Sequence, residues 1–337
     1  MKVEANRPCL VCGSERSTPL LERTYPIYRY PGRFSIRRCE GCGLLFNSPR
    51  LRDRELFQLY DDNYYFFQRH DSDEMARIVR IYQRTMALLP KGTNTQRVAE
   101  VGSAKGYLLA LLQEMGCQVQ GIEVSKEAAE YAESFFHVPT FNGTVEDYVA
   151  LAPADTFDIV LAIDVLEHVP DPRTFLGAID QLLKDDGILI LDTPNASAAN
   201  IGVLRENWEG FNPFHIVLFT RHNLASLLTS MGYGIERDFS YGNQMADRRP
   251  RSVKSRLRAA VIPLLLRTGM FGPCQRLYKR IGKRLRSPAP ARDVLLRDAV
   301  EAVRTGPSYL GTADATDALS RDALGDSLVV IARKARR

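Results

Sequence analysis

Short apolar runs alternate with stretches of helical periodicity through the middle of the chain. Mostly apolar segments lie at residues 98–101, 157–163 and 188–191, and more polar strand-like segments lie at 118–124 and 139–141. Leucines recur at helical spacing between 101 and 118. A strand that forms an unbroken apolar run is buried on both faces, which is typical of a parallel sheet covered by helices. The pattern therefore predicts an α/β fold with a parallel sheet from residue 97 onward.

Small residues form the junction between the first apolar run and the helix that follows it. The junction reads Gly102-Ser103-Ala104-Lys105-Gly106, and the strand-like segment that follows the helix closes on Glu123. Glycines at such a turn let a ligand lie against the backbone at a helix N-terminus. An acid at the tip of the second strand can accept two hydrogen bonds from ribose hydroxyls. These features predict a nucleoside-binding unit.

The spacing of the glycines indicates which nucleoside is bound. A dinucleotide fingerprint, G-x-G-x-x-G, requires glycines at 102, 104 and 107, whereas the chain has Ala104 and the bulky Tyr107. The string Glu100-x-Gly102-x-Ala104-x-Gly106 instead resembles the E/D-x-G-x-G-x-G of class I S-adenosylmethionine (SAM) methyltransferases. In that family the loop holds the methionine end of the cofactor. Ala104 departs from the family pattern at the middle glycine.

Later segments extend this resemblance in order and spacing. Residues 143–147 stand where such enzymes contact adenine, and residues 156–172 and 182–192 match their fourth and fifth strands. The resemblance implies SAM as cofactor and a Rossmann-like, seven-stranded, mostly parallel sheet whose last strand, residues 327–332, is antiparallel. The expected cofactor-binding residues are Glu100, Gly102, Ser103, Ala104, Gly106, Glu123, Val124, Thr144, Val145, Ile163 and Asp164.

Four of the six cysteines form two matching pairs. The pairs are Cys9-x2-Cys12 and Cys39-x2-Cys42, each followed by a glycine that permits a tight turn. Four thiolates at this spacing are the expected ligands of a tetrahedral zinc ion. Because they leave no coordination position open, the sequence predicts a structural zinc. Two disulfides are the alternative, which a reducing compartment disfavours.

The segment between the cysteine pairs and the sheet carries a second resemblance. Residues 43–50 and 59–67 resemble the N-terminal portion of bacterial methyltransferases that carry a cysteine-knuckle head and modify sugars or other biosynthetic intermediates. In that setting the aromatic stretch would cover the cofactor pocket. The predicted parts are a zinc-ribbon module (1–50), an aromatic helical linker or lid (51–90), a SAM-binding core (91–241), a basic helical insertion (242–320) and the closing strand of the core (321–337).

Two of the five histidines follow strands at the carboxyl edge of the predicted sheet. They are His168 and His215. Ligands of open α/β sheets bind at this edge. Methyl transfer to a hydroxyl or a carbon acid requires the loss of one proton, and histidine is the natural base near neutral pH. We therefore expect one of these two histidines to be catalytic.

The segment around His168 resembles ubiquinone-biosynthesis O-methyltransferases. Some of those enzymes are thought to bind magnesium through its acids and histidine, which would implicate Asp164, Glu167 and His168 here. Many related metal-free enzymes have nearly the same string, so magnesium is disfavoured. His215 matches a histidine of cysteine-knuckle C-methyltransferases of deoxysugars, but their fuller Tyr-His-Glu-His pattern is absent. Its absence disfavours methylation of carbon.

Positive charge is concentrated in one part of the chain. Residues 248–292 contain 14 Lys/Arg and no Asp/Glu, although the formal net charge of the whole chain is only +5. Leu277, Ile281 and Leu285 recur at helical spacing within this segment and predict a basic amphipathic helix. An anionic membrane surface or a lipid-linked acceptor suits such a helix. A solvated basic face packed on the domain is the alternative.

Length and composition limit the remaining classes. The 337 residues, 45% of them hydrophobic, suffice for a sizeable core in about two units. Residues 1–25 lack a signal-peptide core, and the longest apolar run, residues 259–266, is too short to span a membrane. We therefore expect a cytoplasmic protein, held at the inner face of the membrane if the basic segment binds lipid.

Three functions are consistent with these features. The first is a SAM-dependent methyltransferase that modifies a hydroxyl, or a carbon, of a small or lipid-linked acceptor such as a sugar or glycan intermediate. The second is a nucleic-acid methyltransferase, which is disfavoured because Ile163-Asp164-Val165-Leu166 is not the Asn/Asp-Pro-Pro-aromatic turn of base amino-group methylation. The third is a catalytically silent SAM-binding protein, disfavoured by the presence of the loop, the ribose acid and both histidines. The sequence does not determine the oligomeric state.

Overall fold

The computed structural model describes the cysteine pairs, almost the whole sheet and its closing strand. The described residues are 3–4, 8–25, 33–57, 85, 88–90, 95–152, 156–241, 296–297, 301 and 325–336. The predicted aromatic lid at 59–67, His70, Cys274 and the basic segment at 248–292 lie outside the described residues.

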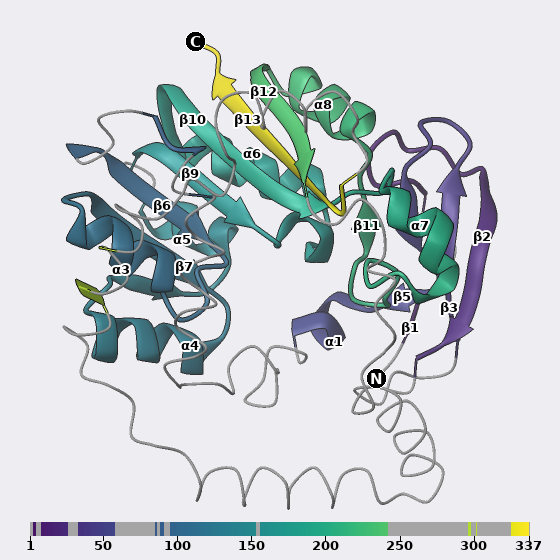
Figure 1. The fold of residues 1–337 in the computed structure, drawn as a ribbon, viewed down its shortest axis with the longest axis horizontal. Coiled ribbons are helices and arrows are strands. Elements are labelled where there is room, and N and C mark those ends of the chain that lie inside the picture. Colours follow the sequence, from purple (N-terminus) through teal and green to yellow (C-terminus); the bar gives the residue numbers. More distant parts are fainter. Residues whose placement is uncertain are drawn as a thin grey trace, which may run out of the picture.

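A seven-stranded sheet forms the centre of the molecule (Figure 1). Its strands in chain order are β6 (Arg97–Val101), β7 (Gln118–Glu123), β8 (Thr140–Asn142), β9 (Phe157–Ile163), β10 (Leu183–Pro194), β12 (Tyr233–Tyr241) and β13 (Ser327–Lys334). Their order across the sheet is β12-β13-β10-β9-β6-β7-β8. Strands β6 to β10 pair in parallel, and β13 pairs antiparallel with both β10 and β12. The predicted mostly parallel sheet with an antiparallel last strand is confirmed.

Helices connect the parallel strands. They are α3 (Tyr107–Glu114), α4 (Lys126–Tyr131) with a π-helical turn η5 (Ala132–Phe136), α5 (Val145–Leu151), a 3-10 turn η6 (Leu166–His168), α6 (Pro172–Leu182), α7 (Ala199–Leu204), a 3-10 turn η7 (Arg205–Asn207) and α8 (Arg221–Ser230). Local caps fix where several of them begin. Thr220, for example, forms a reciprocal capping box with Asn223 at the start of α8.

Apolar side chains cover both faces of the sheet. Alternate residues of one strand belong to different cores: Val160 packs in the core that includes α6 and α8, and Ile159 in the core that includes α3. Successive side chains of a strand point to opposite faces, so an unbroken apolar run serves two cores at once. The prediction of a sheet covered on both sides is confirmed.

A second, four-stranded sheet contains the N-terminal part of the chain (Figure 1). It consists of β2 (Ser17–Thr24), β3 (Arg33–Cys39), β4 (Leu45–Asn47) and β11 (Val217–Leu218), in the order β11-β4-β3-β2. A short pair, β1 (Val3–Glu4) with β5 (Arg50–Leu51), and helix α1 (Asp53–Phe57) lie next to it. Strand β11 comes from the long connection between β10 and α8. The N-terminal sheet is therefore completed by a strand of the central unit.

The closing strand is tied to the same long connection by the partly buried carboxylate of Asp326. Asp326 precedes β13, and its two oxygens accept hydrogen bonds from Trp208 Nε1 at 3.0 Å and Asn200 Nδ2 at 2.7 Å. Trp208 and Asn200 are 4% and 3% exposed. Each bond joins segments more than 100 residues apart, so Asp326 fixes the connection against the sheet.

Among the described residues, none of the helices is both long enough and apolar enough to cross a membrane.

Replacing Asp326 with Ala is expected to destabilise the fold by about 3 kcal/mol, because it leaves a buried indole N–H and a buried amide without their charged acceptor. Urea unfolding measures the change. The control is Glu236→Ala, which removes an exposed ion pair with Arg333 and should cost less than about 1 kcal/mol. Equal midpoints for the two variants would contradict the assigned role of Asp326.

Candidate functional site

The loop after β6 has a left-handed backbone at three positions. The φ angles are 74° at Gly102, 47° at Ala104 and 73° at Gly106, and Gly106 is the N-cap of α3. Glycine adopts such angles without strain, whereas alanine at φ > 0 costs about 1 to 2 kcal/mol. The departure of Ala104 from the family pattern thus falls at a position where the backbone itself favours glycine.

Glu123 connects this loop to the tip of β7. Its Oε2 accepts a hydrogen bond from Ala104 N at 2.8 Å and its Oε1 accepts one from Ser125 N at 2.7 Å. The side chain is 5% exposed, and burial raises the pKa of its carboxyl while the backbone N–H groups act in the opposite direction. Each carboxylate oxygen has a second lone pair. Glu123 therefore fixes the loop and retains acceptor capacity for the predicted ribose hydroxyls.

Glu100 places a second carboxyl beneath the loop. It is 3% exposed, and its Oε2 has no hydrogen-bond partner among the described residues. Burial, followed by the nearby charge of Glu123, raises the pKa of Glu100 well above its usual range. A buried acceptor of this kind fits a cationic ligand group. SAM carries both a sulfonium and an ammonium group, so the loop residues fit this cofactor.

The other residues expected to bind the cofactor follow β7, β8 and β9, and those expected near adenine lie at 143–147. Val124 is 37% exposed next to Glu123, whereas Val145 is 2% exposed. Thr144 caps α5 in a capping box with Asp147. Ile163 ends β9, and Asp164 after it is exposed with a φ of 52°. All these positions lie at the carboxyl ends of parallel strands, so the sheet brings the predicted cofactor residues to one edge.

The segment after β9 lies directly against the glycine loop. A Cβ atom built on Gly102 would lie 2.4 Å from Cγ2 of Val165, which is closer than any real contact. Ser103, 2% exposed, lies at the same turn. Only a residue without a side chain fits at position 102. The close approach puts the turn that carries His168 next to the predicted cofactor loop.

His168 and His215 are brought together from separate connections. Their ring centroids are 4.8 Å apart, with an interplanar angle of 69°. Nδ1 of His168 lies 2.9 Å from the carbonyl oxygen of Phe214, and Nδ1 of His215 lies 2.9 Å from that of Gly210. A carbonyl oxygen only accepts, so both Nδ1 atoms carry hydrogen and both Nε2 atoms carry the lone pair of the neutral ring.

Burial keeps both imidazoles neutral. It lowers the pKa of His168 to about 4 and, with a contribution from His168, that of His215 to about 3. Glu167, the residue before His168, is 0% exposed, and burial together with the charge of Asp164 raises its pKa well above the usual range. Its Oε1 lies 3.7 Å from His168 Nε2. The ligand atoms of Glu167, His168 and His215 all lie within 4.8 Å of one another.

Magnesium does not match this arrangement. Among the described residues, the group of close ligand atoms contains His215 and not Asp164, which is exposed. Magnesium prefers an octahedral shell of oxygen ligands, whereas two of the three side chains here are imidazoles. The magnesium set that the resemblance implied, Asp164 with Glu167 and His168, is not assembled.

Sequence reasoning missed the residues that hold His215 in place. Asn47 of β4, 3% exposed, donates from Nδ2 to the carbonyl oxygens of Asn212 at 3.0 Å and His215 at 2.7 Å. The backbone N–H of Ile216 donates to the carbonyl of Glu167 at 2.7 Å. No local motif marks Asn47, because its partners lie more than 160 residues away. Only the pairing of β4 with β11 brings them together.

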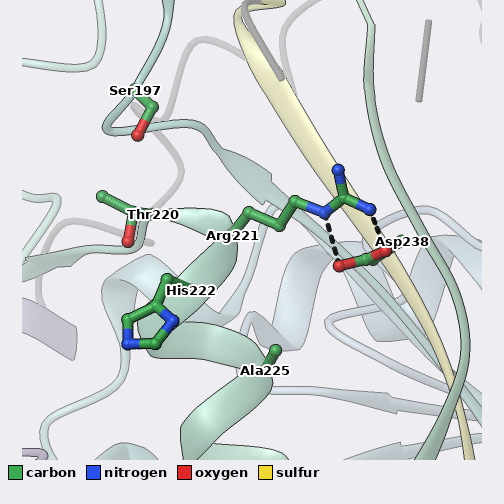
Figure 2. Close-up of a pocket in the computed structure, with 6 residues that line it drawn as sticks. All are labelled: Ser197, Thr220, Arg221, His222, Ala225 and Asp238. Atoms are coloured by element: carbon green, nitrogen blue, oxygen red, sulfur yellow. Dashed lines mark hydrogen bonds and ion pairs between the residues drawn. The ribbon is translucent and has the colours of Figure 1, made fainter. Parts of the chain in front are cut away.

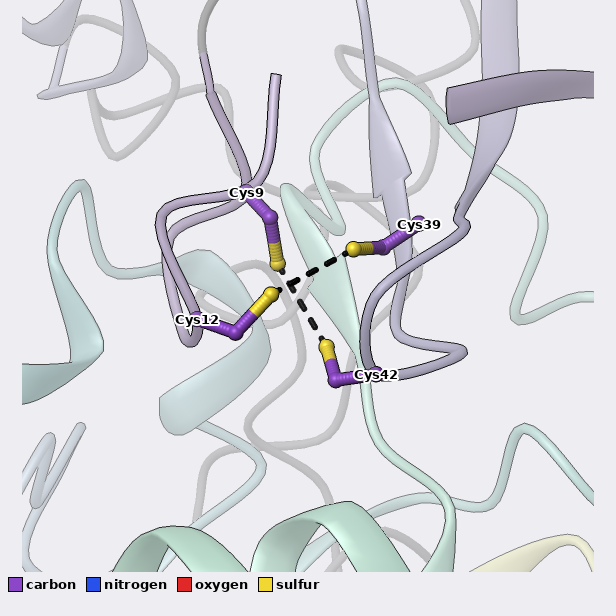
Figure 3. A group of neighbouring side chains, drawn as sticks. All are labelled: Cys9, Cys12, Cys39 and Cys42. Atoms are coloured by element: carbon purple, nitrogen blue, oxygen red, sulfur yellow. Dashed lines mark hydrogen bonds between the residues drawn. The ribbon is translucent and has the colours of Figure 1, made fainter. Parts of the chain in front are cut away.

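The four paired cysteines converge on one point (Figure 3). The Sγ atoms of Cys9 and Cys42 are 3.6 Å apart, and those of Cys12 and Cys39 are 3.5 Å apart. These separations exceed a disulfide bond of about 2.05 Å. They approach the value of about 3.8 Å that Zn–S bonds of about 2.3 Å imply for a tetrahedral ion. The donor set fits zinc, and the predicted clustering of the four cysteines is confirmed.

Local backbone shapes the thiol cluster. The glycines after the two pairs, Gly13 and Gly43, have φ angles of 71° and 75°, as the predicted turns require. Burial raises the pKa values of Cys9 and Cys42. Burial acts in the same direction on Cys39, but hydrogen bonds led by the backbone N–H of Cys42 lower its pKa to about 7.

A separate hollow of about 510 Å³ lies beside α8 and β12 (Figure 2). Its lining residues are Ser197, Thr220, Arg221, His222, Ala225 and Asp238. Arg221 Nε donates to Asp238 Oδ2 at 2.5 Å, and this carboxylate raises the pKa of the guanidinium. None of the sequence-predicted site residues lines the hollow. The two charged side chains in its lining, Arg221 and Asp238, form an ion pair with each other.

Known proteins share the central unit. A family model described as a Methyltransferase domain matches residues 67–237. A ubiquinone biosynthesis O-methyltransferase of Actinobacillus pleuropneumoniae serotype 7 (strain AP76) is 32% identical over 127 residues, which are 35% of this chain and 52% of that protein. One of Xanthomonas campestris pv. campestris (strain B100) is 37% identical over 108 residues, 31% of this chain and 45% of that protein. The chain thus spans about half the length of these relatives.

A crystal structure of a SAM-dependent methyltransferase from Archaeoglobus fulgidus is similar over 81% of this chain and 100% of its own, with a TM-score of 0.47 and 17% identity. The Methyltransferase domain match covers half of the chain, and the sheet order and glycine loop agree with it. The chain belongs to the class I SAM-dependent methyltransferase family.

Proposed function

We propose that the chain transfers the methyl group of SAM to a hydroxyl of a small-molecule acceptor. The proposal rests on the hydrogen bond, 2.8 Å long, that the Glu123 carboxylate accepts from the backbone N–H of Ala104 in the glycine loop. This hydrogen bond joins the acid that would bind the ribose to the loop that would bind the cofactor, at the carboxyl edge of the sheet. The turn that bears His168 lies against the same loop through Val165 and Gly102.

The cofactor residues would divide the work of binding. Glu123 accepts from the ribose hydroxyls, and the loop from Gly102 to Gly106 with Glu100 receives the cationic methionine end. Val124, Thr144, Val145, Ile163 and Asp164 surround the adenine. Methyl transfer is an in-line displacement at the sulfonium carbon, so the enzyme mainly orients the acceptor.

One of the two histidines would accept the acceptor's proton during methyl transfer, as a base that burial makes weaker than free imidazole. The hydroxyl oxygen forms a bond to the methyl carbon as the carbon–sulfur bond breaks, and the hydroxyl proton passes to Nε2 of His168 or His215. Both rings are neutral and already hold their Nδ1 hydrogens toward carbonyl oxygens. Their orientation is therefore set before substrate binds.

The relatives' names favour oxygen over carbon as the methylated atom, since they are ubiquinone biosynthesis O-methyltransferases. The cysteine-knuckle head favours a sugar or glycan intermediate, and the basic segment at 248–292 favours a lipid-linked form presented at an anionic membrane. The division into parts at residues 50, 90, 241 and 320 belongs to the same proposal.

Incubating the chain with methyl-labelled SAM and separate lipid, glycan and RNA fractions of cells tests the acceptor class. We expect label in the lipid or glycan fraction, bound as a base-stable methyl ether. Label confined to RNA would establish the nucleic-acid alternative. No label in any of these fractions, with SAM bound, would contradict a lipid-linked or glycan acceptor.

Replacing Glu123 with Gln should weaken SAM binding by about 2 to 4 kcal/mol, because one or two charge-assisted hydrogen bonds to ribose are lost. Calorimetry then shows a dissociation constant raised about 30-fold to about 1000-fold. The matched control is Glu130→Gln, an exposed acid of α4 paired with Lys126, which should bind SAM like the unaltered chain. Unchanged affinity in the Glu123 variant would remove the ribose role.

We also propose that the cysteine cluster holds one structural zinc. Arg173 of α6 donates to the carbonyl oxygen of Val11 at 2.9 and 3.2 Å, so the first cysteine knuckle is attached to the central unit. Metal bound by four thiolates would fix this contact and the strands that follow it.

Cys39→Ser should cost the purified chain one equivalent of zinc and lower its unfolding temperature by more than 5 °C, since structural zinc contributes directly to folding. Elemental analysis and thermal unfolding measure both. Cys117→Ser, a buried thiol outside the cluster, serves as the control and should keep the zinc. Full zinc content in the Cys39 variant would contradict the proposal.

A further inference from the structure

Three side chains with ligand atoms converge where the turn η6 meets the connection to β11. They are Glu167, His168 and His215, whose ligand atoms lie within 4.8 Å of one another. Two are neighbours in sequence, and the third comes from a segment 47 residues away. A group assembled from two connections by backbone pairing is more specific than an exposed acidic patch.

The histidines are oriented as metal ligands usually are. Nδ1–H of His168 donates to the carbonyl oxygen of Phe214, and Nδ1–H of His215 donates to that of Gly210, both at 2.9 Å. Metal-binding histidines typically donate their second ring N–H to a carbonyl or a carboxylate, which fixes the tautomer and the ring orientation. The Nε2 atom of each ring is thereby the one that can coordinate.

Glu167 supplies a carboxylate oxygen whose position is also fixed by a hydrogen bond to the other oxygen of the same group. Its Oε2 accepts a hydrogen bond from Thr193 Oγ1 at 2.9 Å. Its Oε1 is buried and has no hydrogen-bond partner among the described residues. Because an uncompensated buried carboxyl oxygen costs free energy, each one in a folded protein needs an explanation. The nearest ring nitrogen, His168 Nε2, lies 3.7 Å from this oxygen.

The three ligand atoms are somewhat farther apart than the ligands of a small bound ion. Ligands about 2.0 to 2.1 Å from a tetrahedral ion are about 3.3 to 3.4 Å from one another. The pair from Glu167 and His168 is about 0.4 Å wider than this. The other ligand atoms lie within 4.8 Å of one another, so they are up to about 1.4 Å wider than this spacing. Binding of an ion would therefore draw the three side chains closer together.

The donor set selects the class of ion. Two imidazole nitrogens and one carboxylate oxygen suit zinc, cobalt, manganese or iron, whereas magnesium and calcium take oxygen ligands. Three protein ligands leave coordination positions open, in contrast to the four thiolates of the cysteine cluster. The site is thus of the type that binds a further oxygen ligand.

We propose that Glu167 Oε1, His168 Nε2 and His215 Nε2 bind one divalent transition-metal ion of the zinc and cobalt class. Metal binding is independent of SAM. Its part in the reaction, which rests on the proposed function, is to bind the acceptor hydroxyl and lower its pKa, so that the hydroxyl proton passes to water as the methyl group is transferred. The metal-loaded chain thus uses the ion for the step that an Nε2 atom performs in the metal-free chain.

Cobalt(II) added to the full chain, with the cysteine cluster already filled by zinc, tests the site. Cobalt held by nitrogen and oxygen lacks the intense thiolate-to-cobalt absorption, so the two sites are distinguished by their spectra. We expect one equivalent of cobalt without the thiolate band. In the His215→Ala and Glu167→Gln chains the affinity should fall at least about tenfold.

The matched control is His222→Ala, an exposed histidine of α8, which should bind cobalt like the unaltered chain. Thermal unfolding checks that each variant folds. If His215→Ala does not fold, Glu167→Gln still tests the site, because its amide oxygen can accept the hydrogen bond from Thr193. Absence of cobalt outside the cysteine cluster, or equal affinity in folded Glu167→Gln, would overturn the proposal. SAM affinity is measured separately: cobalt binding without SAM binding would remove the proposed function and leave the metal site.

Discussion

The loop between η7 and α8 depends on hydrogen bonds from three distant parts of the chain. Asp326, before the closing strand, accepts from Trp208 at its start, and Asn47 of the N-terminal sheet donates to the carbonyl of His215. The carbonyl of Glu167 accepts from Ile216. A loop inside a fold must satisfy its backbone polar groups. Doing so here sets the position of His215 beside His168.

The same constraint joins the cysteine module to the catalytic unit. Strand β11 belongs to this loop and pairs with β4, which belongs to the N-terminal sheet. The cysteine cluster closes the turns on either side of β2 and β3, and Arg173 attaches one knuckle to α6. Metal bound by the thiolates would therefore influence the histidines through the strands and Asn47, although no cysteine contacts them.

Three buried acids lie at the carboxyl edge of the sheet. Glu100, Glu123 and Glu167 lie at or just beyond the ends of β6, β7 and β9, are at most 5% exposed, and have raised pKa values because burial disfavours their charge. Such groups are retained when a cation compensates them. The sulfonium and ammonium groups of SAM can do so near Glu100, and a metal ion can do so at Glu167. The requirement that a cation compensate a buried carboxylate thus accounts for both proposed ligands.

Local features of the sequence determined the sheet strands, the glycine loop, the cap at Thr220 and the cysteine pairs, because hydrophobic period, backbone preference and ligand spacing all act within a few residues. The sequence also placed His168 and His215 at one edge, since parallel strands bring their carboxyl ends together. The tertiary structure alone decided that β11 completes the N-terminal sheet, that Asn47 holds His215, and that His215 replaces Asp164 beside Glu167. These contacts depend on the path of long connections, whose hydrogen bonds find partners only after the sheets have formed.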